Sequence, residues 1–161
     1  MKQKDIAMVG RVVNCDFPAL KVTNVPCKVD TGADLSSIWA SDVRVDKNGL
    51  SCVFFGPLSP FYSGEKAHFS NNSFSLTRVS SSFGNKQLRY KVKIKIHIDN
   101  RVVNATFTLA DRSNKLYPVL LGRRLLRNKF IVNVAQGTPL VQAEKLRRRK
   151  LSEDMSKLKG E

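Results

Sequence analysis

The chain has 161 residues, 42% of them hydrophobic, which is the length of one domain with enough apolar side chains for a modest core. Its 28 lysine and arginine residues outnumber 13 acids and give a net charge of +15, a balance typical of nucleic-acid or ribosome binding, or of an enzyme with an acidic substrate. We find no apolar run long enough for a membrane span, no secretory signal, and three widely spaced cysteines, so we exclude a membrane protein and a disulfide-stapled secreted domain and expect a cytoplasmic chain with reduced thiols.

Hydrophobic periodicity predicts a mainly β structure. Strands are expected at residues 6–13, 25–29, 50–55, 73–79, 90–98, 103–109, 119–121 and 130–134. The clearest alternation is at 90–98, where apolar residues alternate with Lys91, Lys93, Lys95 and His97. A tight turn at Asp99 and Asn100 then leads into the return strand. This pattern predicts an antiparallel hairpin with one wet, basic face.

The remaining segments are interpreted as loops, one short helix and a tail. Residues 56–64 and 80–85 are rich in Gly, Pro and Ser and are expected to be loops, either of which could cover a site. A short helix is expected after Gly122. From residue 141 the chain becomes strongly charged, with apolar residues spaced among the charges, which predicts a terminal amphipathic helix or a frayed segment. We therefore expect one domain at 1–140 and a basic C-terminal tail at 141–161.

An unusual acid stands at Asp30, where a β-rich run ends in Asp-Thr-Gly before a second apolar run that contains Trp39. The simpler interpretation is a turn, since Asp and Gly both favour turns. Hydrolysis by carboxylates, however, needs two of them close together, one ionised as general base and one protonated. Glycine beside the aspartate would let the backbones of two such loops approach closely. Trp39 is expected in the core.

The segment VDTGADLSSIWA at 29–40 resembles the active-site loop of retropepsin-like aspartic proteases, and LLGR at 120–123 resembles their second signature. The order of MVGR, KVDTGA, RVSSSFGNKQLRYKV, FTLADRSNKLYPVLLGRRLL and FIVNV is similar to that of a bacterial family labelled ATP-dependent zinc proteases, over about residues 7–140. The resemblance implies an all-β fold, a closed small β-barrel of the retropepsin type with one short helix. It also implies that Asp30 is the catalytic carboxylate and that Thr31 and Gly32 complete its loop.

The resemblance further implies a homodimer, because the chain holds one Asp-Thr-Gly and a lone carboxylate cannot be acid and base at once. Substrate contacts are expected from Ala33, Asp34, Arg112 and Arg123. Asp34 stands where the family commonly has Arg, so it would either raise the pH optimum or face solvent. Arg112 could instead form a local salt bridge with Asp111. Arg123 would oppose the helix dipole, which hints at pairing with an acid.

The family label implies that ATP and zinc are bound, but the sequence has no GxxxxGK[ST] loop and no HExxH motif. Its histidines, His68 and His97, are far apart, and its cysteines lack CxxC spacing. We therefore expect no metal and no cofactor.

The expected partners follow from the charge and from the resemblance. Some family members resemble enzymes encoded beside a ligase that adds glutamates to a small-subunit ribosomal protein, which implies an acidic peptide substrate. A groove lined by basic residues would attract such a peptide; the candidates are Lys91, Lys93, Lys95, Arg112 and Arg123. The alternative is a non-catalytic β-barrel whose basic surface, including the run 147–150, binds RNA, the ribosome or peptides without cleavage.

Overall fold

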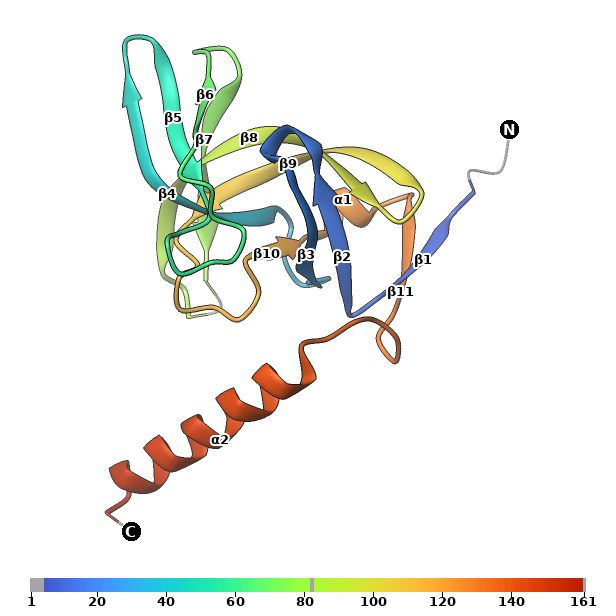
Figure 1. Cartoon of the computed structure of the whole chain (residues 1–161), viewed down its shortest axis with the longest axis vertical. Coiled ribbons are helices and arrows are strands. Elements are labelled where there is room, and N and C mark those ends of the chain that lie inside the picture. Colours follow the sequence, from blue (N-terminus) through green and yellow to red (C-terminus); the bar gives the residue numbers. More distant parts are fainter. Residues whose placement is uncertain (1–4, 82, 161) are drawn as a thin grey trace.

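The computed structural model describes residues 5–81 and 83–160, and it is mostly β with few helices (Figure 1). Its strands are β1 (Ala7–Gly10), β2 (Val12–Phe17), β3 (Val22–Val29), β4 (Ser36–Asp46), β5 (Gly49–Phe54), β6 (Lys66–Phe69), β7 (Phe74–Ser80), β8 (Lys86–Ile98), β9 (Arg101–Ala110), β10 (Val119–Leu121) and β11 (Phe130–Asn133). The helices are the 3-10 turn η1 (Pro18–Leu20), α1 (Arg123–Leu126) and α2 (Val141–Leu158). The predicted mainly β class is confirmed.

The expected closed barrel is wrong. The main sheet has the order β10-β3-β2-β8-β9-β4-β5-β6, and β10 pairs with β4 as well as with β3. The sheet does not stop at these pairings, however, because β4 has 11 residues and β8 has 13, and the ends of both strands extend past the strands that a small barrel would contain. The surplus of β4 pairs with β5, and the first half of β8 pairs with β7, so within the described residues the sheet extends outward and ends at β6.

The hairpin predicted from alternation is confirmed as β8 and β9. Asp99 lies in the left-handed region at φ 49° and, with Asn100, connects the two strands. The inward side chains are almost fully buried and belong to the main core: Val92, Ile94, Ile96, Ile98, Val103, Ala105, Phe107 and Leu109. Trp39, also expected in the core, is 9% exposed. Period-2 alternation was sufficient here because one face of the hairpin packs inward and the other faces solvent.

The N-terminal prediction of one strand at 6–13 is too simple. Two strands meet at Arg11: β1 pairs in parallel with β11, whereas β2 pairs with β3 and β8. Two further strands, β4 and β6, were missed. The first half of β4 is buried without alternation, and β6 alternates over only four residues, which is too short a stretch to stand out.

The predicted connections and the cysteines complete the fold. The chain between β5 and β6 is irregular, as expected for 56–64. The 80–85 turn connects β7 and β8, although Ser82 lies outside the described residues. All three cysteines are free and buried. None of the helices in the described ranges has the length and apolar character needed to cross a membrane.

Candidate active site

The Asp30 loop begins where β3 ends and is shaped by its own backbone. The Asp30 N–H donates to the carbonyl oxygen of Leu121 at 2.9 Å, which joins the loop to β10. The Asp30 carboxylate oxygen Oδ1 accepts hydrogen bonds from the N–H groups of Gly32 (3.1 Å) and Ala33 (3.2 Å). The half-buried carboxylate is therefore held in a set orientation by main-chain donors.

The segment around Gly122 clamps this loop from the other side. The Gly122 N–H donates to the buried Ser36 Oγ at 3.0 Å. The next two N–H groups, of Arg123 and Arg124, donate to the carbonyl oxygens of Ala33 (2.8 Å) and Asp34 (3.2 Å). A Cβ on Gly122 would lie 2.6 Å from the carbonyl carbon and oxygen of Leu35, so glycine is required for close approach. The two motifs singled out in the sequence are thus one structural unit.

Asp34 points to a different side of the loop. Its carboxylate lies 2.9 Å from Arg124 Nη2 and 3.7 Å from Arg123 Nη2, and its side chain is 49% exposed. Pairing of Arg123 with an acid, expected from its place at a helix start, is therefore observed. Thr31, Asp34, Arg123 and Arg124 line a pocket of about 740 Å³ that does not include Asp30.

Asp30 opens into its own pocket of about 530 Å³. Basic side chains dominate its lining: Arg11, Lys28, Arg112, Lys115, Arg147 and Arg148. The carboxylates among the lining residues are Asp30 and Glu144. The pocket is therefore strongly electropositive, as an acidic ligand would require.

Arg112 is the buried cation of this pocket. It is 9% exposed and its Nε donates to the carbonyl oxygen of Tyr117 at 3.0 Å. Burial, and to a smaller extent Arg89, lower the pKa of Arg112 to about 10, while the nearby Asp30 opposes the shift. The guanidinium therefore remains charged at neutral pH. The alternative salt bridge to Asp111 is absent from the described residues. Asp111 instead accepts a hydrogen bond from the Ser113 N–H at 2.9 Å, which lowers the pKa of Asp111.

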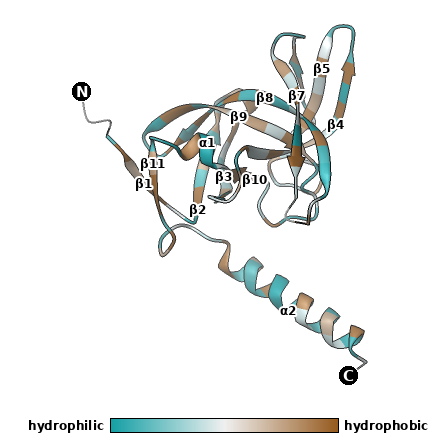
Figure 2. Ribbon diagram, turned by 180° about the vertical axis from the view of Figure 1, so that it is seen from behind, coloured by the Kyte–Doolittle hydropathy of each residue, from teal (hydrophilic) through white to brown (hydrophobic). Residues whose placement is uncertain are grey.

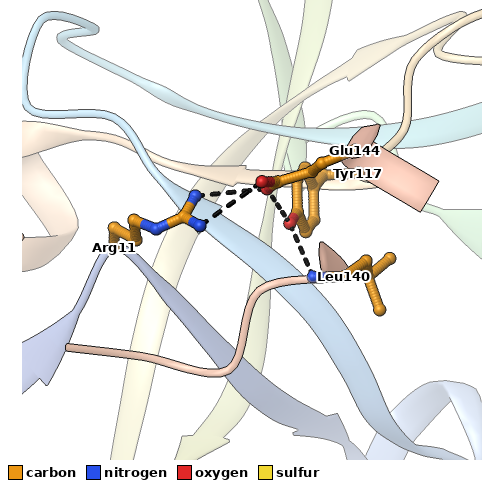
Figure 3. Close-up of polar contacts among 4 residues, drawn as sticks. All are labelled: Arg11, Tyr117, Leu140 and Glu144. Carbon is orange, nitrogen blue, oxygen red and sulfur yellow. Dashed lines mark hydrogen bonds and ion pairs between the residues drawn. The ribbon is translucent and has the colours of Figure 1, made fainter. Parts of the chain in front are cut away.

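Sequence reasoning missed the contribution of α2. Glu144, Arg147, Arg148 and Leu151 of this helix line the Asp30 pocket. Glu144 accepts hydrogen bonds from Arg11 Nη1 (3.2 Å) and Nη2 (3.3 Å) and from the Tyr117 hydroxyl (2.6 Å), as Figure 3 shows. These bonds lower the pKa of Glu144, while burial and then the bond to Glu144 raise that of Tyr117. The terminal helix was one of the two alternatives expected for this basic segment, but no sequence signal indicated where it would pack.

The lysines of the β8 face do not line the Asp30 pocket, contrary to expectation. Lys91 and Lys93 lie in a separate groove of about 830 Å³ together with Arg124 and Lys129. They point outward from β8, away from the core side of the sheet. Of the expected groove cations, Arg112 alone shares the pocket with Asp30 in the part of the chain that the structure describes.

Metal ions in proteins are commonly held by clusters of His, Cys, Asp and Glu side chains. Within residues 5–81 and 83–160, no group of three or more such side chains is placed to hold an ion.

An Asp-Thr-Gly loop at a strand end, clamped by a glycine that opens a short helix, defines the site of a retropepsin-like protein. The family model described as "RimB-like: Retropepsin-like aspartic endopeptidase RimB" matches residues 8–142. The chain therefore belongs to this family. The retropepsin-like assignment made from the motifs is confirmed, and the family's description includes neither zinc nor ATP.

Curated relatives and a solved structure extend this comparison. The chain is 32% identical over 133 residues to a probable alpha-L-glutamate ligase of Shewanella pealeana, covering 81% of this chain and 29% of that protein. A protein of the same name from Desulfotalea psychrophila is 25% identical over 147 residues, covering 88% and 32%. The chain thus spans about three tenths of these relatives' length. The fold is shared with Lpg0085, a protein of unknown function (DUF785) from Legionella pneumophila, at a TM-score of 0.62 and 24% identity over 83% of this chain and 97% of that one.

Proposed function

We propose that the chain is an aspartic peptidase in which Asp30 activates water for peptide-bond hydrolysis. The observation that carries the proposal is the Asp30 carboxylate, oriented by the N–H groups of Gly32 and Ala33 and open to a pocket. An ionised Asp30 would take a proton from water while a protonated second carboxylate polarises the amide carbonyl. The water attacks directly, so no covalent intermediate forms.

The second carboxylate is proposed to be Asp30 of a second copy. The other acids near the loop are already engaged, because Glu144 is bound by Arg11 and Tyr117, and Asp34 is paired with Arg124. A homodimer would bring two Asp30 side chains together, where like charges share one proton.

The contact surface between the two copies is proposed to be the two-stranded sheet of β1 and β11. Met8 and Ile131 are register partners there and are 55% and 56% exposed. Ile6, just before β1, is 49% exposed. These neighbouring apolar side chains would gain by burial against a second copy, which supports the dimer.

The substrate is proposed to be an acidic peptide, with the glutamate-rich end of a ribosomal protein as the leading example. Six basic side chains and two carboxylates line the Asp30 pocket, so a peptide rich in carboxylates is attracted and oriented. The curated relatives are named as alpha-L-glutamate ligases, and an enzyme that removes glutamates would act on the same type of chain.

The test is mass-spectrometric detection of cleavage in oligoglutamate-tailed and mixed-sequence peptide pools, with chelator and without ATP. Wild type should cleave and Asp30→Asn should not, while both have the same circular dichroism and sedimentation. Wild-type and Asp30→Asn chains are refolded together in a one-to-one mixture and compared with wild type at the same total protein concentration. Activity should fall to about one quarter if each site needs two intact copies, because about one quarter of the dimers then hold two wild-type chains. A fall to one half would contradict the shared site.

A second candidate function is RNA or ribosome binding through the groove of Lys91, Lys93, Arg124 and Lys129. None of the residues that line this groove is acidic, and Asn72, Asn104 and Thr106 add neutral polar groups. Such a surface would contact phosphates with little sequence preference. Lys91→Gln/Lys93→Gln should then weaken retention on RNA without changing peptide cleavage, and unchanged retention would reject this function.

A further inference from the structure

Helix α2 is attached to the β domain through one end, beside the Asp30 pocket. In Figure 1 it runs away from the strands, so its N-terminal turns are the part nearest to them. The attachment is the cluster in Figure 3: Glu144 accepts hydrogen bonds from Arg11 and from the Tyr117 hydroxyl, which in turn accepts one from the Leu140 N–H at 3.0 Å. Because Tyr117 is 5% exposed and belongs to the segment leading into β10, the cluster positions α2 relative to the Asp30 loop.

One face of α2 is turned toward the pocket. The pocket-lining residues of α2 begin with Glu144, and Arg147, Arg148 and Leu151 follow it by three, four and seven positions. This spacing places all four on a single side of the helix. Arg149 and Lys150, in the same basic run, are not among the lining residues. Figure 2 shows hydrophilic and hydrophobic residues mixed along α2, and none of the residues of this helix is buried, so apolar packing alone does not explain why this face is turned inward.

The two arginines of this face are free to bind a ligand. Within the described residues, neither Arg147 nor Arg148 forms an ion pair with an acid of the chain. Glu144, the acid nearest to them on the helix, accepts its hydrogen bonds from Arg11 and Tyr117, and Arg148 acts on it only through its charge at longer range. Guanidinium groups bind carboxylates through paired, charge-assisted hydrogen bonds, so two unpaired arginines beside a hydrolytic aspartate suit a substrate that carries carboxylates.

We propose that α2 is a substrate-binding element, in which Arg147 and Arg148 bind side-chain or terminal carboxylates of an acidic peptide whose backbone lies at Asp30. The proposal deepens the proposed peptidase function and rests on it for the position of the scissile bond. It assigns the basic tail to the site itself, as a determinant of specificity.

Binding is measured in the Asp30→Asn background, so that cleavage does not interfere. The probes are fluorescein-labelled hexaglutamate and, as the neutral peptide, hexaglutamine, followed by fluorescence anisotropy. Arg147→Gln/Arg148→Gln should weaken hexaglutamate binding about tenfold or more, which corresponds to at least about 1.4 kcal/mol. The matched control Arg149→Gln/Lys150→Gln removes the same charge from the same helix and should change the Kd less than about twofold.

Two further measurements separate a local role from general charge or folding. Arg147→Lys/Arg148→Lys keeps the charge but loses the paired geometry, and should recover only part of the affinity. In the active enzyme, Arg147→Gln/Arg148→Gln should raise KM for hexaglutamate with kcat unchanged, because the arginines bind substrate without touching the reacting atoms. Circular dichroism should show equal helix content in all variants.

The outcomes are distinct. Equal loss of affinity in the two glutamine variants, or no loss in either, overturns the role of α2. Selective loss in the Arg147→Gln/Arg148→Gln variant supports it. If that selectivity is found but the wild type cuts no peptide, the peptidase function fails while carboxylate binding by α2 stands.

Discussion

The Asp30 loop and α2 border the same pocket but are held in opposite ways. The loop is fixed by main-chain hydrogen bonds to Leu121, Gly32 and Ala33 and by the close packing of Gly122. Helix α2 is held near the pocket by side chains, through one carboxylate that is ionised at neutral pH. The comparison teaches that the position of the Asp30 carboxylate is set by the backbone, whereas the position of the basic residues of α2 depends on single side chains and on pH.

The largest effect is expected where the loop is packed most closely. Gly122→Ala places a Cβ 2.6 Å from the backbone of Leu35, so the clamp must open, at a cost of about 3 kcal/mol in the free energy of unfolding. Gly122 has φ −88°, which any residue adopts, so the cost is steric. Urea denaturation measures it.

Gly32→Ala is the comparison within the same loop. Its Cβ would meet one atom, Asp30 Oδ1 at 3.3 Å, which can move. The loss of stability should therefore be below about 1 kcal/mol, although activity should fall because Asp30 is displaced. Equal destabilisation by the two substitutions would contradict the clamp.

A smaller effect is expected from the hydroxyl that anchors Gly122. Ser36→Ala leaves the buried Gly122 N–H without its acceptor and should cost about 2 kcal/mol. The neighbouring Ser37 is the control, because its buried Oγ has no hydrogen-bond partner among the described residues. Ser37→Ala should leave the thermal midpoint unchanged or raise it, since it removes an unsatisfied polar group. A similar drop in both midpoints would show that the Ser36 bond is unimportant.

Loosening the attachment of α2 should lower the free energy of unfolding by less than the Ser36 substitution does. Tyr117→Phe removes the donor to Glu144 and the acceptor of the Leu140 N–H, and should lower stability by about 1 kcal/mol. Amide hydrogen exchange should speed up in the first turns of α2 and stay unchanged in β8 and β9. Tyr62→Phe serves as control, because Tyr62 is 38% exposed and its hydroxyl makes no hydrogen bond within the described ranges. Unchanged exchange in α2 would contradict the anchor.

The smallest effect is the pH dependence of the same attachment. The bonds from Tyr117 and Arg11 lower the pKa of Glu144, so its stabilising contribution is fully present above the ordinary glutamate value of about 4.3. The contribution is lost as the pH falls through the lowered pKa, and since Glu144 is partly exposed it should amount to less than about 1 kcal/mol. After correction for the intrinsic pH dependence of amide exchange, the protection of the α2 amides should fall on acidification. In Glu144→Gln this fall should be absent; if it persists, another group is responsible.

Prediction from sequence succeeded where local pattern and local structure agree. The β8 and β9 hairpin follows from alternation, because one face is buried and the other is wet. It failed for β4, whose buried first half has no alternation, and for the closed barrel, because the pairing of the ends of β4 and β8 with β5 and β7 is not encoded by period. The Lys91 and Lys93 face was predicted correctly as basic and placed wrongly beside Asp30.

Four features could be read from the sequence alone: the Asp-Thr-Gly loop, the glycine that opens the following helix, the mainly β class and the excess of positive charge. Each of these is carried by residue identity or by spacing within a short window. Only the tertiary structure decided which cations surround Asp30, that Asp34 faces Arg123 and Arg124, and that Arg147 and Arg148 line the pocket. The physical reason is that long-range placement depends on a few contacts between distant segments, here the bonds of Glu144 to Arg11 and Tyr117, and no local periodicity reports them.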